Sequence, residues 1–254
     1  MKSFFKIFIF VSLVFVPVKQ YSQHHSHLDV ELNQEKKTLV VQQKIVFHNT
    51  SQDTLSFIIL NDWNNAYATK NTPLANRFSD EFYRGFHLAK EEERGKTTVL
   101  SCTGTAQAEL DWKRTNENPD VVIVHLKNKL APNQKATIQV SYLVKIPSSK
   151  FTKYGYSDTG SMVLKNWFLT PARYENHAFV TYSNNNLDDI ANGVSDYSIE
   201  LKIPVLTGNQ TQNLDVTTDL NTVKKTETKN YTSYELSGKN RTDFSLFIEI
   251  DYQI

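Results

Sequence analysis

The sequence predicts a mainly β protein: an antiparallel β-sandwich or a set of packed sheets, with one short helical insertion near residues 72–90. Aromatic residues make up 12% of the chain, and together with abundant Thr and Val they favour strands over helices. Many short segments alternate apolar and polar residues, as strands with one buried face do. Turn sequences separate these segments at regular intervals, which is typical of two packed sheets.

Three strands are expected at the start of the mature chain. Residues 28–32 alternate apolar and polar side chains, residues 38–48 resume the pattern, and residues 54–60 form a third apolar segment. The polar sequences at 33–37 and 49–53 read as turns. Two consecutive hairpins of this kind predict an antiparallel meander.

The segment from 72 to 90 breaks the strand pattern. Thr72 and Pro73 match a helix start, with Thr as the N-cap and Pro at the first helical position. Every fourth residue that follows is apolar and lines one helical face: Leu74, Phe78, Phe82 and Phe86. We expect one amphipathic helix or two short ones, packed on a sheet.

The remainder of the chain returns to β patterning. A polar, loop-like stretch occupies residues 147–159. Strands are predicted on both sides of it, at 97–102, 106–112, 121–126, 135–146, 161–169, 178–182, 197–203, 214–218, 231–236 and 244–250. A single β domain over residues 23–254 is therefore expected.

The first 22 residues have the layout of a secretory signal peptide. Lys2 and Lys6 give a basic start, residues 4–16 are almost wholly apolar, and cleavage is expected near Ser22 or Gln23. A spanning helix needs roughly 20 apolar residues, so this run is too short to be a membrane anchor. We expect an exported protein, periplasmic or extracellular, with no membrane span in the mature chain.

Charge and cysteine content exclude further classes. The formal net charge is +1, which gives no reason to expect nucleic acid as a partner. Cys102 is the only cysteine, so the fold has no intramolecular disulfide and depends on its core. Because Cys102 follows Leu100 in a strand-like run, it is interpreted as a core residue rather than a nucleophile.

The sequence contains no complete catalytic site. No His is followed by Glu, which excludes the His-Glu-x-x-His zinc motif. The chain also lacks a Gly-x-Ser-x-Gly elbow, and its 8 glycines form no phosphate-binding loop. The adjacent carboxylates Asp188 and Asp189 follow an Asn-rich stretch and are interpreted as turn or cap residues rather than a glycosidase pair.

One histidine cluster stands near the expected mature N-terminus. If cleavage follows Ser22, His25 becomes the third residue, and a free amine, two amides and an imidazole can hold copper or nickel in a square plane. The alternative interpretation of His24, His25 and His27 is a mobile polar tail, which is the preferred one. No metal site is assigned to this chain.

Four stretches occur in an order that resembles a known family. They are Phe47–Ser51, Leu60–Tyr67 with Thr72–Ala75, Lys165–Tyr174, and Tyr182–Asp189 with Asp196–Pro204. The first runs from a strand into an Asn-containing turn, and the second contains Asn65-Ala66-Tyr67. Together they resemble the N-terminal, non-catalytic β domain of the aminopeptidase N-like zinc metallopeptidases (gluzincins), in a secreted bacterial form.

This resemblance implies a partner. The β domain would lie beside a thermolysin-like catalytic domain that carries the zinc, absent from this chain and connected in cis if the chain is a fragment. Asn166 would stand where the family places a Gln or Glu that holds the amino group of a peptide substrate. Four residues would face the catalytic domain, with Trp167 or Phe168 partly exposed in an apolar patch: Trp167, Phe168, Pro171 and Tyr174.

Three functions remain open from the sequence. The first is an accessory domain that helps to shape the peptide-binding cleft of a secreted zinc metallopeptidase, which needs no cofactor of its own. The second is a stand-alone exported module that binds peptide or carbohydrate. The third is a structural protein of the cell envelope.

Overall fold

A computed structural model describes residues 24–185, 191–205 and 213–251. Strands account for 53% of the described residues and helices for 11%. The mainly β prediction is therefore confirmed. The predicted signal peptide, residues 1–22, and the pair Asp188 and Asp189 lie outside the described residues.

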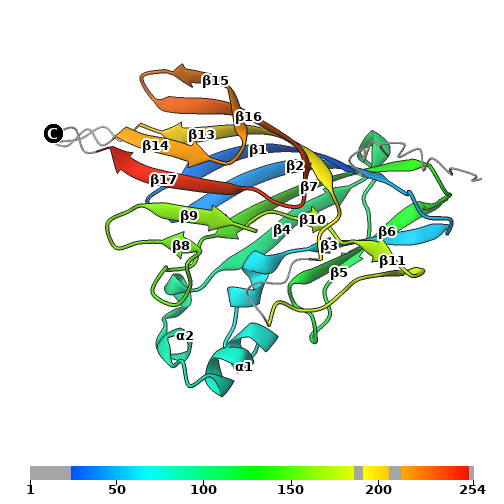
Figure 1. Ribbon diagram of the computed structural model, residues 1–254, viewed down its shortest axis with the longest axis horizontal. Helices are drawn as coiled ribbons and strands as arrows, with labels where there is room; N and C mark the ends of the chain where they lie inside the picture. The colour runs from blue at the N-terminus through cyan, green and yellow to red at the C-terminus, as the bar shows by residue number, and fades with distance from the viewer. Residues whose placement is uncertain (1–23, 186–190, 206–212, 252–254) are drawn as a thin grey trace, which may run out of the picture.

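The largest sheet has seven strands in the order β15-β16-β13-β1-β2-β7-β4 (Figure 1). Neighbouring strands run antiparallel, except that β1 and β13 are parallel. In chain order its strands are β1 His24–Asn33, β2 Thr38–His48, β4 Lys96–Thr103, β7 Lys135–Lys145, β13 Ser195–Pro204, β15 Asn221–Glu227 and β16 Tyr231–Arg241.

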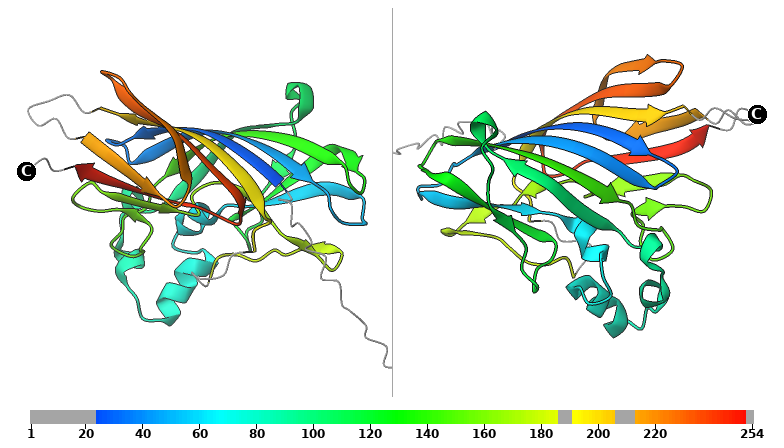
Figure 2. Two further views of the ribbon diagram at one scale, coloured as in Figure 1. Left: turned by 45° about the horizontal axis from the view of Figure 1, so that its top comes forward. Right: turned by 180° about the vertical axis from the view of Figure 1, so that it is seen from behind.

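Two four-stranded sheets face the inner side of the large sheet, one toward each end (Figure 1; Figure 2). One has the order β10-β3-β6-β5: β3 Leu55–Asn61, β5 Trp112–Lys113, β6 Val121–Leu130 and β10 Thr170–Pro171. The other has the order β14-β17-β9-β8: β8 Gly155–Tyr156, β9 Met162–Lys165, β14 Asn213–Thr218 and β17 Ser245–Asp251. A small hairpin joins β11 Tyr174–Glu175 to β12 Ala178–Phe179.

The core lies between these layers. Alternate residues of β1 are buried, and those of β13 follow the same pattern, so both strands face inward on one side only. An aromatic cluster fills the space between β13 and the β9–β17 pair: Trp167, Phe168, Tyr197 and Phe244. Phe168 and Phe244 are stacked, with ring centroids 4.3 Å apart.

The predicted meander is only partly correct. β1 and β2 form the expected hairpin, but β3 belongs to the sheet β10-β3-β6-β5, where it pairs with β6. Both edges of β2 are already occupied, by β1 and β7. The run from Ile58 to Asn61 is buried on both faces, which suits a strand between layers better than one with a solvated face.

The helical insertion consists of α1 Pro73–Asp80 and α2 Gly85–Leu88, flanked by the 3-10 turns η1 Trp63–Tyr67 and η2 Glu91–Glu93. Thr72 caps α1 as predicted, because its hydroxyl accepts a hydrogen bond from the Ala75 amide. The predicted apolar face is wrong at Phe82. The helix ends at Asp80, Phe82 takes a left-handed φ of 57°, and its ring is 91% exposed.

Two predicted strands fail for local reasons, and one strand of the structure was not predicted. Residues 106–112 contain the 3-10 turn η3 Thr105–Gln107, because Ala106 and Gln107 have φ values of 57° and 59°, which no strand permits. β15 is missing from the predicted strands because every one of its side chains is exposed, so no alternation marks it. The predicted strand 161–169 is likewise broken where Asn166 turns left-handed.

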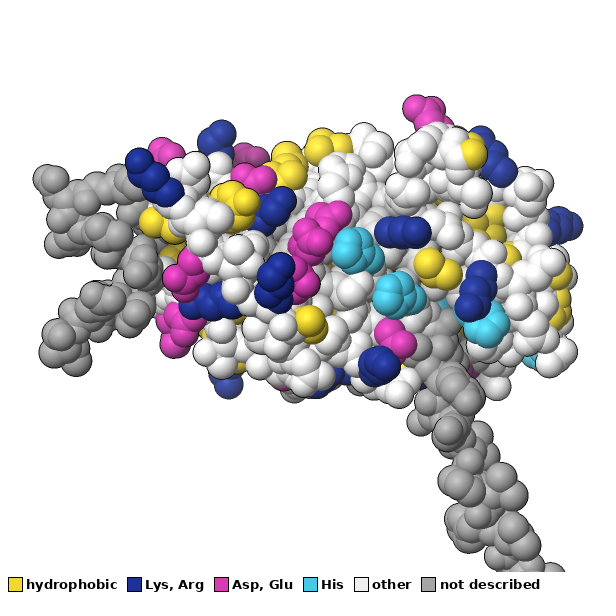
Figure 3. Space-filling view, turned by 90° about the horizontal axis from the view of Figure 1, so that it is seen from above, with side chains coloured by type: hydrophobic (Ala, Val, Ile, Leu, Met, Phe, Trp, Pro, Cys, Tyr) yellow, Lys and Arg dark blue, Asp and Glu magenta, His cyan; other side chains and the backbone are white. Residues whose placement is uncertain are grey.

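The outer face of the large sheet is a mixture of charged, polar and isolated apolar side chains (Figure 3). Val40 and Leu143 are paired across β2 and β7 and are partly exposed, but charged and polar groups surround such residues on this face. Single exposed apolar residues are normal on a soluble surface. This face therefore gives no sign of a continuous apolar docking surface.

The aromatic cluster makes Trp167 a sensitive stability probe. Trp167→Ala should lower the free energy of unfolding by about 3–5 kcal/mol, because the ring is fully buried and its loss leaves a cavity. Trp167→Phe should cost less, since it also removes an indole N–H that is buried without a partner. Urea denaturation followed by circular dichroism measures both. The more exposed Trp112 is the control, and an equal cost for Trp112→Ala would contradict the central role of Trp167.

Candidate functional site

A cavity of about 610 Å³ opens between η1, the loop 149–154 and β9. Its wall is largely aromatic, formed by Trp63, Tyr67, Tyr83, Phe151 and Tyr154. Four of these rings are buried and Tyr83 is partly exposed. A concave, mainly apolar space with a few polar groups is the usual form of a small-ligand site.

The polar lining of the cavity comes from lysines and amides. Lys150, Lys153 and Lys165 contribute to the cavity, and all three side chains are exposed. Asn166 and Asn184 are the two amides of the lining. Both amide oxygens are buried and have no hydrogen-bond partner. The residue predicted to bind substrate, Asn166, therefore lies at this cavity.

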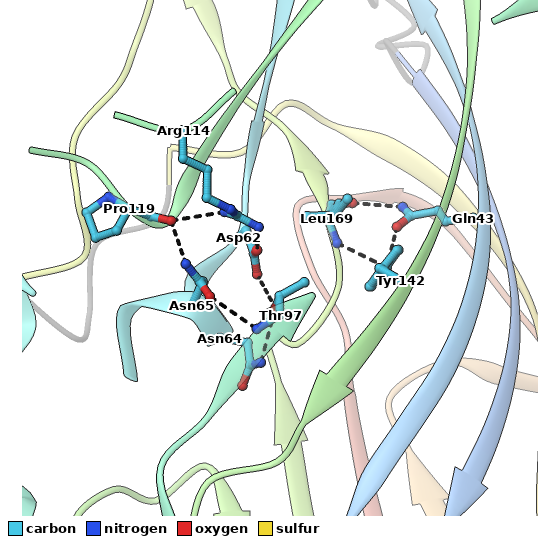
Figure 4. A network of polar contacts seen from close by, with 9 residues as sticks. All are labelled: Gln43, Asp62, Asn64, Asn65, Thr97, Arg114, Pro119, Tyr142 and Leu169. Carbon is cyan, nitrogen blue, oxygen red and sulfur yellow. Dashed lines mark hydrogen bonds and ion pairs between the residues drawn. The ribbon is translucent and has the colours of Figure 1, made fainter. Parts of the chain in front are cut away.

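A buried ion pair forms the centre of a network of polar contacts next to the turn η1 (Figure 4). The Asp62 carboxylate is 1% exposed and pairs with the Arg114 guanidinium. Its second oxygen accepts a hydrogen bond from the Thr97 hydroxyl at 2.7 Å. Arg114 also donates to the Pro119 carbonyl, which accepts a second bond from the Asn65 amide. A buried charge costs several kcal/mol unless it is paired and hydrogen-bonded in this way.

Asn64 connects this network to the cavity. Its amide nitrogen donates to the Thr97 hydroxyl at 3.1 Å, and its oxygen accepts a 2.8 Å hydrogen bond from the Tyr154 hydroxyl. Tyr154 is a wall residue of the cavity. Burial raises its pKa well above the ordinary range, so the hydroxyl stays protonated and remains a donor.

A second buried carboxylate holds the opposite wall. Asp120 accepts hydrogen bonds from the Ser183 hydroxyl and from the Asn184 backbone amide. Burial raises the pKa of Asp120, and these two hydrogen bonds oppose the rise. The Asp120 carbonyl accepts from the Asp62 amide at 2.8 Å, so the two carboxylate centres are joined through the backbone. Asn184 is thereby fixed at the cavity wall.

The backbone explains why Asn occupies position 166. Asn166 has a φ of 54°, in the left-handed region that Asn tolerates better than most residues. This turn ends β9 and directs Trp167 into the core. Two hydrogen bonds then tie Leu169 to the large sheet: Gln43 donates to its carbonyl, and its amide donates to the Tyr142 hydroxyl. Tyr142 in turn donates to Gln43, which joins the two partners (Figure 4).

The expected exposure of the docking residues is wrong. Trp167 is 0% exposed and Phe168 is 1% exposed, because both rings belong to the aromatic cluster between the sheets. Pro171 is buried in β10, where it pairs with Leu60. Tyr174 is partly exposed, and its hydroxyl donates to Asp53. The first three side chains stabilise this domain and leave no surface of their own for a partner.

The histidine cluster is part of a strand rather than a mobile tail. His24, His25 and His27 lie in β1, and alternation places His24 in the core while the other two face outward. His24 stacks on Phe47 and accepts a hydrogen bond from the His48 amide. Its ring nitrogen lies so close to Gly193 that a Cβ there would clash, at 2.7 Å. The three imidazoles therefore cannot converge on one ion.

The remaining candidates are structural. Cys102 is buried in β4, and burial raises the pKa of its thiol to about 11, which disfavours a thiolate nucleophile. Within residues 24–185, 191–205 and 213–251, no group of three or more His, Cys, Asp or Glu side chains could share a metal ion. The helices in those ranges are too short or too polar to cross a membrane.

Several cavity residues were missed from the sequence. The stretch 147–159 reads as a polar loop, yet its Phe151 and Tyr154 are buried in the cavity wall. The presence of two aromatic residues in an otherwise polar loop was the sequence feature that could have indicated their burial. Nothing in the sequence pairs Asn184 with Asp120, because their contact spans 64 positions.

Comparison with known proteins gives a fold and no close relative. The sequence matches no protein-family profile and no curated protein. Among solved structures, an M1 zinc metallopeptidase from Deinococcus radiodurans is similar at 12% identity and a TM-score of 0.50. The match covers 90% of this chain and 41% of that one.

The chain has the fold of part of an M1 zinc metallopeptidase. A two-domain M1 zinc metallopeptidase mutant bound to L-tryptophan is similar at 13% identity, with a TM-score of 0.49, over 90% of this chain and 42% of that one. The present chain thus spans about two fifths of the length of these structures. The fold implied by the sequence resemblance is confirmed.

Removing the cation from the buried ion pair should be costly. Arg114→Met should lower the free energy of unfolding by about 3–5 kcal/mol, because it leaves the buried Asp62 charge unpaired. Arg77→Met is the matched control: it removes a solvent-exposed pair with Glu81 and should cost at most about 0.5 kcal/mol. Chemical denaturation measures both. Equal costs would show that the buried pair does not organise the site.

His24 should make the fold sensitive to acid. Burial, aided by the nearby His48, lowers its pKa to about 3. An unfolded His binds a proton near pH 6.5, so between 6.5 and 3 the unfolded state holds more protons and stability falls as pH falls. The slope from this residue reaches about 1.4 kcal/mol per pH unit.

His24→Phe should therefore flatten the dependence of the unfolding free energy on pH below 6.5, while a ring remains available to stack on Phe47. Urea denaturation at a series of pH values gives this slope directly. His125→Gln, which removes an exposed imidazole, is the control. An unchanged slope in His24→Phe would show that another group causes the acid sensitivity.

Proposed function

We propose that this chain is the N-terminal, non-catalytic β domain of an exported, aminopeptidase-like zinc metallopeptidase. Residues 1–22 act as the signal peptide and residues 23–254 form the domain. The observation that carries the proposal is the likeness of 90% of the chain to less than half of an M1 zinc metallopeptidase. The zinc and its ligands belong to a catalytic domain connected in cis, since no His-Glu-x-x-His motif occurs in this sequence.

The contribution of this domain is to shape one side of a peptide-binding cleft. The cavity at Asn166 supports this role, because two buried carboxylates and an aromatic wall hold it open in the domain by itself. The catalytic domain supplies the chemistry, and the β domain positions the peptide. Such preorganisation lowers the entropic cost of binding.

The surface for the catalytic domain is the tip formed by residues 82–88. Phe82 is 91% exposed, Leu88 is 78% exposed, and Tyr83 lies at the cavity. An exposed Phe at positive φ is unfavourable for both solvation and backbone conformation, and such strain is commonest at functional positions. The helices that carry this tip project from one end of the molecule (Figure 1). We propose this surface in place of the docking surface that the sequence predicted at Trp167, Phe168 and Pro171, because those three side chains are buried.

A stand-alone exported module that binds peptide or carbohydrate is the second candidate. A concave space lined by aromatic rings and amides suits that alternative as well. Aromatic rings combined with amide hydrogen-bonding groups suit a sugar ring as well as a peptide. The two candidates differ in whether a catalytic domain adjoins the chain.

The coding DNA decides between them. We expect the reading frame to continue past the codon for Ile254 into a domain containing His-Glu-x-x-His. In that longer protein, replacing the tip with Phe82→Asn and Leu88→Ser should weaken the contact between domains and raise KM, while Asn relieves the positive φ of residue 82. Aminoacyl-anilide hydrolysis and limited proteolysis between the domains are the measurements.

Val223→Ser is the matched control, because Val223 is exposed on the edge strand β15, away from the helical tip. It should leave both KM and proteolysis unchanged. A stop codon after Ile254 with no neighbouring gene for a zinc domain would contradict the proposal and favour the stand-alone module.

A further inference from the structure

The charge of the cavity is one-sided. Three lysines line it, and none of the described lining residues is acidic. Lys150 is offset by Glu93 and Asp158, whose oxygens lie 3.3 and 3.7 Å from its ammonium nitrogen. Lys153 and Lys165 form no ion pair with the described residues. Lys165 opposes the rise that burial causes in the pKa of Asp243, so the charge of Lys165 is partly offset. Lys153 has no acidic partner among the described residues.

The two amides of the lining need donors. The oxygens of Asn166 and Asn184 are buried and accept no hydrogen bond, which is an unfavourable state for a polar atom. Because nothing holds the Asn166 oxygen, a half-turn about its soft terminal torsion exchanges it with the amide nitrogen at no cost in hydrogen bonds. A ligand N–H at the cavity wall would satisfy it.

The aromatic wall completes the description of the ligand. Trp63, Tyr67 and Phe151 offer ring faces and edges to an aromatic or apolar group. A space of about 610 Å³ admits a small organic molecule, since ligand pockets commonly measure about 300–1,000 Å³. The three features together specify an apolar body, an N–H donor and a negative charge.

We propose that this cavity binds an aromatic carboxylate with an amide N–H: an N-acylated amino acid or the carboxyl end of a peptide. The carboxylate lies toward Lys153 and Lys165, the ring packs on the aromatic wall, and the N–H donates to the Asn166 oxygen. The biological role of this binding rests on the proposed function, but the binding itself is a property of the chain alone.

A cavity with these charges disfavours a ligand that carries a free amino group. An ammonium ion gains little from neutral amide oxygens when lysines line the same cavity, because like charges repel most strongly in a partly desolvated space. The charges of the cavity thus favour a ligand whose amine is blocked.

Three related probes test the proposal on the full chain by isothermal titration calorimetry. N-acetyl-L-phenylalanine carries the carboxylate, N-acetyl-L-phenylalanine amide is neutral, and L-phenylalanine amide carries only the ammonium. We expect the carboxylate to bind about tenfold more tightly than the neutral amide, and its affinity to fall with added salt. We expect the ammonium compound to bind most weakly.

Variants assign the binding to the cavity. Lys153→Gln with Lys165→Gln should remove the tenfold preference for the carboxylate and leave the affinity of the neutral probe unchanged. Asn166→Gly keeps the left-handed backbone and should weaken both acetylated probes. Lys44→Gln, on the exposed face of β2, is the control and should change nothing.

Tighter binding of the ammonium probe than of the carboxylate overturns the proposal, and so does the absence of carboxylate binding up to about 10 mM. Binding that survives the double lysine change without loss of preference also overturns it. None of these results depends on a catalytic domain. The reading frame past Ile254 can fail to encode one while the carboxylate still binds, and the reverse is equally observable.

Discussion

The buried ion pair of Asp62 and Arg114 is the constraint on which the site depends. A carboxylate that is 1% exposed needs its cation and its hydrogen bonds, because an unpaired buried charge costs several kcal/mol. Satisfying it requires the end of β3, the turn η1, the strand β4 and the segment before β6 to meet at one point. Apolar packing alone tolerates small shifts between these elements, whereas directional hydrogen bonds do not. The network therefore sets the relative positions of elements from two different sheets.

The cavity is a consequence of this arrangement. Asn64, which belongs to the network, accepts a hydrogen bond from Tyr154. The Asp120 carbonyl accepts one from the Asp62 amide, and the Asp120 carboxylate accepts one from the Asn184 backbone amide. The Tyr154 ring and the backbone of Asn184 are thus held by hydrogen bonds behind the cavity wall, while the side chains of Lys153 and Lys165 are exposed. A rigid interior with mobile cations at its surface suits a site in which shape selects the ligand and charge orients it. The 3-10 turn η1 has no side-chain cap, so its conformation depends on these same contacts.

The sequence predicts those parts of the fold that are determined locally. β1 and β13 alternate because one face of each meets the core, and Thr72 with Pro73 defines a helix start through a capping bond three residues away. What depends on distant partners could not be predicted. β3 leaves the hairpin because β7 occupies the edge of β2, and the chain reaches β7 about 90 positions after β2. Trp167 carries a strong apolar signal, which fits a core position and a docking surface equally well.

At position 166 a residue type required by the backbone can be mistaken for one required by substrate binding. The resemblance assigns this position to substrate because the family has a Gln or Glu there. The structure gives Asn an independent reason to be present, since a φ of 54° between β9 and the buried Trp167 favours Asn over longer side chains. A Glu would add the negative charge that an ammonium needs, and Asn does not. The backbone requirement therefore leaves lysines as the only charged groups among the described lining residues of the cavity. Under the proposal of an anionic ligand, the turn at 166 fixes the residue type, while Lys165 at the end of β9 and Lys153 in the preceding loop set the charge of the cavity.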